Sequence, residues 1–576
     1  MTDDKFQEPS DLAREGQESD ESQCDQRNQK WEENLPEDVA IENSHKRQEH
    51  SAINMSVLVS FLWHMHQPFY KDLVRKTYVM PWAYLHGTKD YLGMPLLAGE
   101  FPEVHQTFNL VPSLIVQLEE YGAGKANDAV FELAFKPVEE LNETDRGYII
   151  ERFFPVPVRT MLQPFPRYFE LYERRSDPSR HHAFSDQDIR DIQIWWTLTW
   201  MDHDRRPKDF VEKGRNFTEK DKAALRKIVI KTIREIVPAY KQMQDRGVIE
   251  ISTTPFYHPI LPILIDSHVD GRVPVDVHFP YDAREQLERA RKFMGERFGR
   301  LPEGLWPSEG SVSNDAALLA SSVGFRWMAT DEGILAKSGV DLNWDNRRRL
   351  FHPFKRGDMT IFFRDRALSD LIGFQYMHAP AADSASDLLR RLREFPDGAH
   401  VVLALDGENP WDYYQNSGRD FLRRVFEGIQ NEPALEAVTL SEAQKRIPAE
   451  KLDWLAPGSW ASANFSIWIG HPEDHQAWAW IIRAREALMA RKGHVPEEEW
   501  DLAYEELLIA EGSDWMWWFG NDFSSDNDAI FDSLFRQHIG NIYHLVGLPE
   551  PEGLKNPIKK NLEGRRLVMA PPPGGS

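Results

Sequence analysis

Two carboxylates set among tryptophans and glycines are the residues of this chain best suited to chemistry. Glu309 lies in the segment GLWPSEGSVS, and Asp406 lies in HVVLALDGENPWDYY. Cleaving a glycosidic bond with retention needs one carboxylate to attack the anomeric carbon and a second, protonated carboxyl to donate to the leaving oxygen. Neighbouring tryptophans offer flat apolar faces for sugar rings. The two segments therefore predict the acid pair of a glycosidase.

The position of Asp406 supports this interpretation. It follows the apolar run Val401–Leu405, which predicts a buried strand, and barrel enzymes carry their chemistry where strands end. Glu408 and other acceptor-rich side chains crowd the same loop, and such crowding raises a carboxyl pKa, as a general acid requires. An Asx turn is the alternative role for Asp406, and solvated surface is that for Glu309. Asp331, after another predicted strand, stays open as a second candidate for the acid.

A histidine pair ends the first predicted strand, in the segment WHMHQP that contains His64 and His66. Alternate residues of a strand point to the same side, so the two imidazoles can share a zinc ion or line a sugar site. Structural histidines are the third possibility. A metal would need further ligands from His258, His278 or Asp331, and no second tight ligand cluster is evident in the sequence. We therefore predict sugar contacts for both histidines, with no metal and no cofactor.

Five further residues are predicted to bind substrate. Glu250 lies within an apolar strand pattern, where a carboxylate is costly unless it is paired, so substrate contact and a structural ion pair both stay open. His258 follows in a loop and is expected to contact sugar hydroxyls, with a turn histidine as the alternative. Trp306, Trp411 and Trp460 are expected to stack on sugars, although core packing has nearly equal weight for each.

Short apolar runs recur along the chain, and helical patterns such as 281–298 and 383–394 intervene. Strands that alternate with helices predict a parallel α/β sheet, either open or closed into a barrel. The predicted strands are Val57–Trp63, Val104–Phe108, Val248–Thr253, Gly304–Trp306, Phe325–Ala329, Met359–Phe363 and Val401–Leu405.

The flanking and intervening segments indicate the domain organisation. Residues 1–54 are polar and acidic and contain few large apolar side chains. They cannot bury enough apolar surface to offset the conformational entropy lost on ordering, so we expect a disordered tail. A barrel domain is predicted over 55–433, with a largely helical insertion at about 114–246. A helical domain that completes the cleft is expected over 434–555, with amphipathic helices at 475–491 and 497–510. The end, 556–576, has the composition of a flexible tail.

Composition limits the partners of the protein. The chain of 576 residues is too long for one compact core, and its formal charge of −24 argues against nucleic acid or an anionic membrane as a partner. The single cysteine, Cys24, cannot form an internal disulfide. No apolar stretch approaches the ~20 residues of a membrane span, and the amino terminus lacks the apolar core of a signal peptide. We therefore expect a cytoplasmic protein; the sequence does not indicate its oligomeric state.

Taken together, the motifs resemble those of glycoside hydrolase family 57, in its amylopullulanase-like branch. The resemblance covers about residues 55–543, and six motifs in this order carry it. It implies a seven-stranded (β/α) barrel with an appended helical bundle domain, a retaining mechanism and α-glucan substrates, with Glu309 as nucleophile and Asp406 as acid/base. The motifs are HMHQP at His64–Pro68, Gly247 through Glu250 to Pro259, WPSEGS at Trp306–Ser311, LDGEN at Leu405–Asn409, GSW with WIG at Gly458–Gly470, and EGSDW at Glu511–Trp515.

The resemblance implies cleavage of α-1,4 glucosidic bonds, with α-1,6 cleavage as a further possibility. A 4-α-glucanotransferase uses the same double displacement, and residue types do not separate it from a hydrolase. A more distant alternative is a metal-dependent carbohydrate hydrolase or deacetylase that uses His64 and His66 as ligands. A glucan-binding protein without activity is disfavoured, since both proposed catalytic carboxylates are present.

Overall fold

The computed structural model describes residues 56–154, 157–175, 184–343 and 347–560. The chain divides into two units, Met1–Asn54 and Met55–Ser576, and every described residue belongs to the second. The expected tail of residues 1–54, with Cys24, lies outside the described residues, as does the stretch 561–576.

Seven parallel strands in the described part of the chain form the sheet that carries the site. In space they follow the order β10-β1-β4-β5-β6-β7-β9, with every neighbouring pair parallel. The amide of Asp365, just after β9, donates to the carbonyl of Val402 in β10 at 2.9 Å and brings the two ends together. The predicted seven-stranded (β/α) barrel is confirmed. The strands are β1 (Val57–Met65), β4 (Gln106–Leu110), β5 (Ile249–Thr253), β6 (Gly304–Leu305), β7 (Trp327–Asp331), β9 (Met359–Arg364) and β10 (His400–Asp406).

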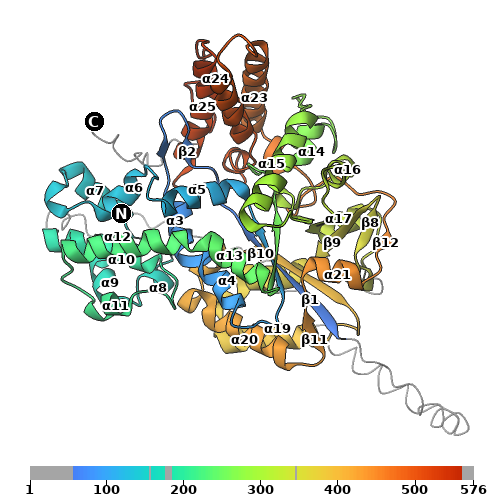
Figure 1. Ribbon diagram of the computed structural model, residues 1–576, viewed down its shortest axis with the longest axis horizontal. Helices are drawn as coiled ribbons and strands as arrows, with labels where there is room; N and C mark the ends of the chain where they lie inside the picture. Colours follow the sequence, from blue (N-terminus) through green and yellow to red (C-terminus); the bar gives the residue numbers. More distant parts are fainter. Residues whose placement is uncertain (1–55, 155–156, 176–183, 344–346, 561–576) are drawn as a thin grey trace, which may run out of the picture. The chain divides into compact units, whose positions relative to one another are not determined.

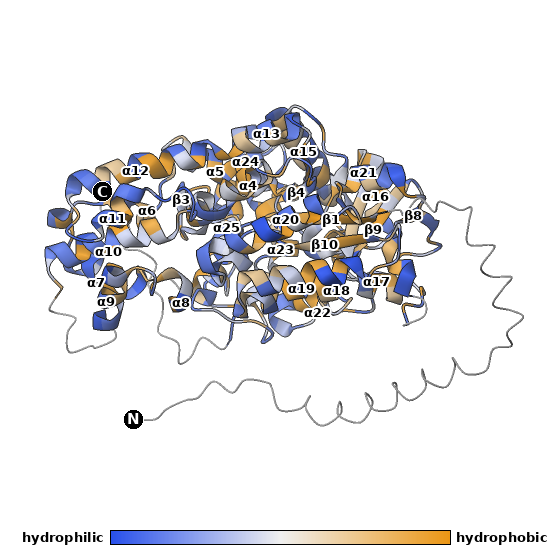
Figure 2. Cartoon of the chain, turned by 90° about the horizontal axis from the view of Figure 1, so that it is seen from below, coloured by the Kyte–Doolittle hydropathy of each residue, from blue (hydrophilic) through white to orange (hydrophobic). Residues whose placement is uncertain are grey.

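Side chains alternate between the inside and the outside of this barrel, as the two-residue period of a strand requires. Along β1, Leu58 and Leu62 join the inner apolar cluster, whereas Val59 and Phe61 join the large outer core beneath the helices. Figure 2 shows β1, β9 and β10 in the orange of hydrophobic residues. The inner cluster consists of Leu58, Leu62, Trp306, Trp327, Ala329, Phe362, Val402, Ala404, Val438, Leu440 and Ala443.

A short helix closes the amino-terminal end of the barrel. Strand β11 (Leu435–Ala437) pairs with the first three residues of β1, and α21 (Leu440–Arg446) follows it directly. Leu440 and Ala443 of this helix belong to the inner cluster. Because this end is plugged, a substrate can reach the interior only from the carboxyl ends of the strands.

The helices of the barrel follow its strands, and the two predicted from periodicity are correct. Helix α15 ends at Gly299, whose φ of +76° only glycine adopts without strain. The barrel helices are α14 (Leu261–Ile265), α15 (Pro280–Phe298), α16 (Asn314–Val323), α17 (Glu332–Lys337), α18 (Arg366–Asp370), α19 (Ala381–Arg393) and α20 (Arg419–Asn431). Two short strands, β8 (Phe354–Arg356) and β12 (Glu450–Lys451), extend the sheet beyond β9.

The segment between β1 and β5 is otherwise mostly helical, and Figure 1 shows α6 to α12 gathered together. Capping boxes at Asn142, Ser185 and Thr218 begin three of these helices. A π-helix, η1 (Gly87–Tyr91), continues directly from α3 (Trp82–His86) and precedes α4 (Gly93–Ala98). The remaining helices are α5 (Pro112–Gly122), α6 (Ala129–Phe135), α7 (Glu143–Arg152), α8 (Val158–Met161), α9 (Pro166–Arg175), α10 (Asp186–Thr199), α11 (Lys208–Lys213), α12 (Glu219–Arg234) and α13 (Ile236–Asp245).

The carboxyl-terminal part is helical, and the helices expected at 475–491 and 497–510 are correct. Figure 1 shows α23 (Pro472–Ala490), α24 (Glu497–Ala510) and α25 (Asp528–Leu545) side by side. Two connections matter for the site: the segment before α22 (Ser466–Ile469), and the segment between α24 and η10 (Met516–Trp518).

Residues 556–560, which we expected to belong to a flexible tail, are packed against the helical part of the protein. The side chain of Ile558 is fully buried, and its amide donates to Asp532 at 2.6 Å. The ammonium of Lys559 donates to the carbonyls of Trp518 and Gly520 at 2.7 Å. These partners lie far away in the sequence, so the composition of the tail does not reveal them. Among the described helices, none combines the length and apolarity that crossing a membrane requires.

Candidate active site

The carboxyl ends of four barrel strands bring five predicted residues to one place. His64 and His66 come from the end of β1, His258 from the loop after β5, Glu309 from the turn after β6 and Asp406 from the last position of β10. The electrostatic influence of His66 extends to both Glu309 and Asp406. These five predicted residues therefore form one cluster at the barrel mouth.

Glu309 has a strained backbone that a distant segment holds in place. Its φ is +56°, in the left-handed region that costs a residue with a Cβ about 1 kcal/mol or more. Val312 and Gly458 exchange amide-to-carbonyl hydrogen bonds of 2.8 and 3.1 Å, and the amide of Trp460 donates to the Glu309 carbonyl at 3.1 Å. A side chain at 458 would collide with the carbonyl of Ala463, which explains the glycine there. Strain of this kind persists where the surroundings impose it, often at functional sites.

The side chain of Glu309 is also bound by Trp460, whose indole Nε1 donates to Oε2 at 2.8 Å. Burial raises the pKa of Glu309 to about 7, and the negative charges of Asp406 and Asp514 act in the same direction. The indole hydrogen bond and His66 oppose this rise, because both favour the carboxylate. Near neutral pH, Glu309 is thus poised between its two protonation states.

Asp406 ends β10 directly opposite His64 of β1. Its Oδ2 accepts from the Asn409 side-chain amide at 2.9 Å, and the amide of Gly407 donates to the His64 carbonyl at 2.8 Å. Burial raises the pKa of Asp406, while Asn409, His66 and Arg364 partly counteract this. Two neighbouring half-buried carboxyl groups with raised pKa values favour holding one proton between them, as an acid–nucleophile pair requires.

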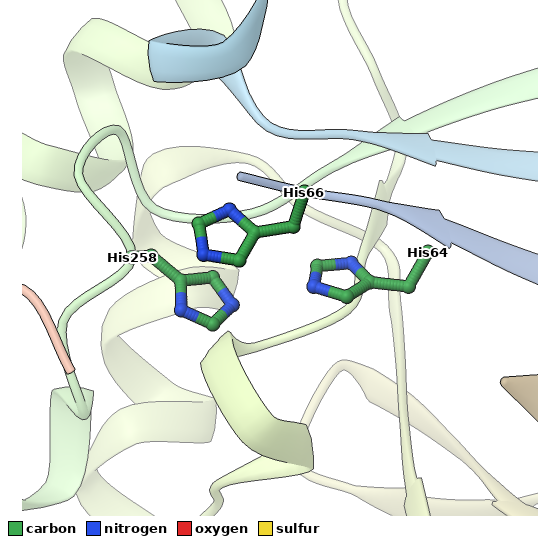
Figure 3. A group of neighbouring side chains, drawn as sticks. All are labelled: His64, His66 and His258. Atoms are coloured by element: carbon green, nitrogen blue, oxygen red, sulfur yellow. The ribbon is translucent and has the colours of Figure 1, made fainter. Parts of the chain in front are cut away.

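The imidazole rings of His64, His66 and His258 lie close together, as Figure 3 shows. The ring centroids of His66 and His258 lie 3.9 Å apart, and those of His64 and His258 lie 5.3 Å apart. Asn109 binds the Nδ1 of His64 at 2.7 Å. Burial lowers the pKa of His64 to about 3 and that of His258 well below 6.5, so both rings are neutral at pH 7.

His66 differs from its neighbours because Asp514 accepts from it. Its Nε2 lies 2.7 Å from Asp514 Oδ1. Burial alone would lower the pKa of His66. The hydrogen bond to Asp514 and the negative charges of Asp514, Glu309 and Asp406 outweigh burial, so the pKa of His66 is raised. In its protonated form, His66 places a positive charge beside the two catalytic candidates and stabilises their ionised forms.

Asp514 comes from the segment between α24 and η10, which also holds His258. The backbone of His258 has φ +59°, its carbonyl accepts from the Ser513 amide at 2.9 Å, and its Nδ1 bonds to the Ser513 hydroxyl at 2.8 Å. The sequence predicts that Glu511 and Asp514 reach the cleft, and Asp514 does reach His66. The basis of this prediction is the break in the helical pattern over Glu511–Asp514, before the aromatic run that follows.

The three histidines were also tested as metal ligands. Their ring nitrogens lie within 4.8 Å of one another. One nitrogen of each ring is bonded within the protein, His64 Nδ1 to Asn109, His66 Nε2 to Asp514 and His258 Nδ1 to Ser513, which leaves the second nitrogen of each ring. A tetrahedral zinc site needs convergent nitrogens about 2.0–2.1 Å from the metal. The remaining nitrogens of His66 and His258 have no partner in the described structure, and such nitrogens can bind either a metal ion or sugar hydroxyls.

Glu250 does not join the site, and its predicted substrate contact is wrong. Its two oxygens accept from the Ser441 amide at 3.0 Å, the Trp327 indole at 3.0 Å and the Thr107 hydroxyl at 3.3 Å. The Ser441 hydroxyl donates as well, at 2.5 Å. Because Ser441 lies on α21, Glu250 faces the plugged amino-terminal end. It is a buried structural acceptor, held by neutral donors where an ion pair was the expected alternative.

The three tryptophans have different surroundings. Trp411 is fully buried, donates to the Gly407 carbonyl at 2.9 Å and packs on Trp63, so the expected sugar contact is wrong and it supports the Asp406 loop from behind. Trp306 is 6% exposed, belongs to the inner apolar cluster of the barrel, and its ring centroid lies 6.3 Å from that of His64. Trp460 keeps a partly exposed face.

Asp331, the second candidate for the acid, is occupied elsewhere. It is fully buried, and Arg364 Nε lies 2.8 Å from its Oδ2 while Arg366 pairs with its other oxygen. A guanidinium group is bound to each of its oxygens, so this carboxylate has no free oxygen to present to a substrate. Arg364 in turn lies over the Trp460 ring at 5.5 Å, so Asp331 supports the site indirectly.

Comparison with known proteins gives relatives of similar fold. A structure of a branching enzyme from Thermococcus kodakaraensis covers 85% of this chain and 90% of its own, with a TM-score of 0.54 and 16% identity. An α-amylase from Thermotoga maritima covers 86% and 93%, with a TM-score of 0.52 and 15% identity. At such identities the likeness shows the fold alone.

Sequence comparison gives a shorter match and a longer one. A 100-residue segment is 27% identical to Alpha-amylase 1 of Dictyoglomus thermophilum; it covers 17% of this chain and only 12% of that relative. The sequence profile of glycosyl hydrolase family 57 matches residues 60–456, which include His64, Glu309 and Asp406. With more than half of the chain matched, this protein belongs to glycosyl hydrolase family 57.

Proposed function

We propose that the protein is a retaining, α-glucan-active glycosidase with Glu309 as nucleophile and Asp406 as acid/base. The observation that carries this proposal is the pair of half-buried carboxyl groups at the barrel mouth. Both have raised pKa values, and the negative charge of Asp406 contributes to the raised pKa of Glu309. The amylase and branching-enzyme relatives support an α-glucan as substrate. Retention further requires the two carboxyl groups to lie about 5 to 5.5 Å apart across the scissile bond.

The proposed reaction has two balanced steps. The Glu309 carboxylate attacks the anomeric carbon, the glycosidic bond breaks, and the Asp406 proton goes to the departing oxygen, which leaves a covalent glycosyl-enzyme. In the second step the oxygen of a water molecule attacks the same carbon, and Asp406, now ionised, takes a proton from that water. The bond between the sugar and Glu309 breaks, which releases the Glu309 carboxylate. When a sugar hydroxyl replaces water, the same chemistry becomes 4-α-glucan transfer.

The surrounding residues support the two steps. Trp460 and His66 favour the ionised form of Glu309, whereas burial favours the protonated form of Asp406. The neutral rings of His64 and His258 offer free nitrogens to sugar hydroxyls, and the buried Nε2 of His258 has no partner in the described structure. Substrate hydroxyls would satisfy such a nitrogen, since buried polar atoms are costly when unpaired.

The finer assignments belong to the same proposal. We place the protein in the amylopullulanase-like branch, with α-1,4 cleavage as its main activity and α-1,6 cleavage as an addition. The division into a barrel domain at 55–433 and a helical domain at 434–555, and a cytoplasmic location for glucan turnover, stay predictions.

Product analysis tests the proposal. Purified protein is incubated with maltoheptaose and, separately, with pullulan, beside Glu309→Ala and Asp406→Ala, with and without a chelator. Shorter maltooligosaccharides from the unmodified protein alone, unaffected by chelator, are expected. Products longer than the substrate would assign a transferase instead, and products from pullulan would add α-1,6 cleavage. No product from any sample, or activity lost with chelator, would overturn the proposal.

A further inference from the structure

A buried lysine outside the described catalytic pair lies between two carboxylates. Lys89, in the π-helix η1, is 2% exposed, and its ammonium lies 2.9 Å from Asp90 and 2.7 Å from Asp412. His86 bonds to the other oxygen of Asp90 at 2.9 Å. Burial lowers the pKa of Lys89, but Asp412 and Asp90 outweigh it and raise the pKa, so the cation is retained. An isolated buried ammonium would be very costly, so this arrangement depends on both carboxylates.

Asp412 belongs to the loop that begins at the proposed acid/base. This loop runs from Asp406 through the short helix η8 (Asn409–Asp412). The carbonyl of Asp412 also accepts from the Thr160 hydroxyl of α8, at 2.5 Å. Asn409, the side chain that binds the Asp406 carboxyl, lies in the same short helix. The anchor at Asp412 therefore fixes the element that carries the hydrogen-bond donor of the acid/base.

The same π-helix reaches the histidine strand. The Tyr91 hydroxyl, buried at 1% exposure, donates to the carbonyl of His66 at 3.0 Å. The short helix η1 therefore contacts two elements of the site. Lys89 pairs with Asp412 in the loop of the acid/base, and Tyr91 binds the end of the strand that carries His66. Single π-helical turns are rare and frequently occur at functional sites, because the wider turn redirects side chains that an α-helix would place elsewhere.

His86, Asp90 and Asp412 also have oxygens and a nitrogen close enough to hold a metal ion. The ammonium of Lys89 already lies within 3 Å of both carboxylates, so the positive charge of this cluster comes from the chain itself. A second cation there would meet strong repulsion. The cluster is therefore an internal ion pair with a structural task.

We propose that Lys89 is a positioning residue for the acid/base: by holding Asp412, it sets the geometry in which Asp406 donates its proton to the leaving oxygen. This inference rests on the proposed function, since it requires Asp406 to be the proton donor. Loss of the ammonium would leave Asp90 and Asp412 to repel each other and release the loop. Proton transfer demands heavy-atom distances of about 2.6–3.2 Å. A shift of the Asp406 loop should therefore impair this step more than nucleophilic attack by Glu309, which lies in a different turn, after β6.

The dependence of rate on the leaving group tests this. A nitrophenyl maltooligoside releases a phenolate that needs no proton, whereas maltoheptaose releases a sugar that does. For Lys89→Met we expect kcat/KM on maltoheptaose to fall about 10²-fold, and to fall at least about tenfold less on the nitrophenyl substrate. Asp412→Asn, which keeps the side-chain volume, should show the same preference, and Lys89→Arg should restore part of the activity on maltoheptaose.

The matched control is Lys222→Met. Lys222 is 1% exposed, pairs with Glu219 at 3.0 Å and donates to the Lys136 carbonyl at 2.7 Å, all within the helical segment away from the loop. Both methionine variants lose a buried lysine, so their thermal unfolding temperatures separate general destabilisation from misplacement of the loop. Lys222→Met should keep the ratio of rates on the two substrates unchanged.

Asp406→Ala decides which proposal an unexpected result affects. If Asp406→Ala shows the leaving-group dependence while folded Lys89→Met and Asp412→Asn lose activity equally on both substrates, Lys89 is structural and this inference fails alone. If Asp406→Ala shows no such dependence, the acid/base assignment fails, and this inference with it. If Lys89→Met does not fold, Asp412→Asn decides by the same comparison.

Discussion

Trp460 binds Glu309 at two points, with its backbone amide on the carbonyl at 3.1 Å and its indole on Oε2 at 2.8 Å. The first bond stabilises a left-handed backbone, and the second favours the carboxylate. A residue far away in the sequence therefore sets both the place and the charge of the proposed nucleophile.

Replacing this indole should shift the pH dependence of catalysis. Glu309 attacks only when ionised, so activity is lost as pH falls through its pKa of about 7. Trp460→Phe removes a hydrogen bond that lowers this pKa, so the acidic limb of the kcat/KM profile should move up by about one pH unit. The backbone bond stays, so the protein should fold. An unchanged acidic limb would contradict the role of the indole.

Neutralising Asp514 should weaken catalysis through His66. Asp514→Asn keeps an acceptor for His66 Nε2 but removes the negative charge that raises the pKa of that histidine. The imidazole then loses its proton at lower pH, and kcat/KM on maltoheptaose should fall about tenfold at pH 7. NMR titration of His66 should show the lowered pKa directly.

The matched control for this variant is Asp522→Asn. Asp522 pairs with His471 at the same distance of 2.7 Å, but its carboxylate is exposed. Activity should therefore stay close to that of the unmodified protein. An equal loss in both variants would show that the effect does not depend on His66.

Changing Glu250 should affect stability and leave catalysis intact. Its two oxygens accept four hydrogen bonds, and the amide group of Glu250→Gln would face donors where an acceptor is required. The free energy of unfolding should fall by about 1–3 kcal/mol, seen as a lower thermal unfolding temperature, while kcat and KM change little. Glu309→Gln should instead abolish most of the activity and change the thermal unfolding temperature little. A raised KM in Glu250→Gln would return this residue to the substrate site.

Removing metal ions should leave activity unchanged. The proposed double displacement needs only the carboxyl groups of Glu309 and Asp406, and we assign the free nitrogens of His64, His66 and His258 to sugar hydroxyls. Protein dialysed against a chelator should cleave maltoheptaose at its original rate. Activity that is lost on dialysis and restored by zinc would revive the metal-dependent alternative.

Local patterns were sufficient to predict much of the fold and the two proposed catalytic residues. Buried parallel strands appear as short apolar runs, and chemistry gathers where such runs end, so Asp406 after Val401–Leu405 was placed correctly at the barrel mouth. His64 and His66 share a face because strand side chains alternate, and this too follows from spacing alone.

The tertiary structure decided what local patterns leave undetermined. Alternation shows that Glu250 points inward, but only the stagger of the strands and the plug α21 show that it faces the closed end, beside Ser441. The partners that fix the site, Trp460 on Glu309, Asp514 on His66 and Lys89 on Asp412, are separated from them by 151, 448 and about 320 residues. A sequence specifies local periodicity and residue chemistry directly. Contacts between distant segments exist only once the barrel has closed and its helices have packed, because only then do those side chains share one buried volume.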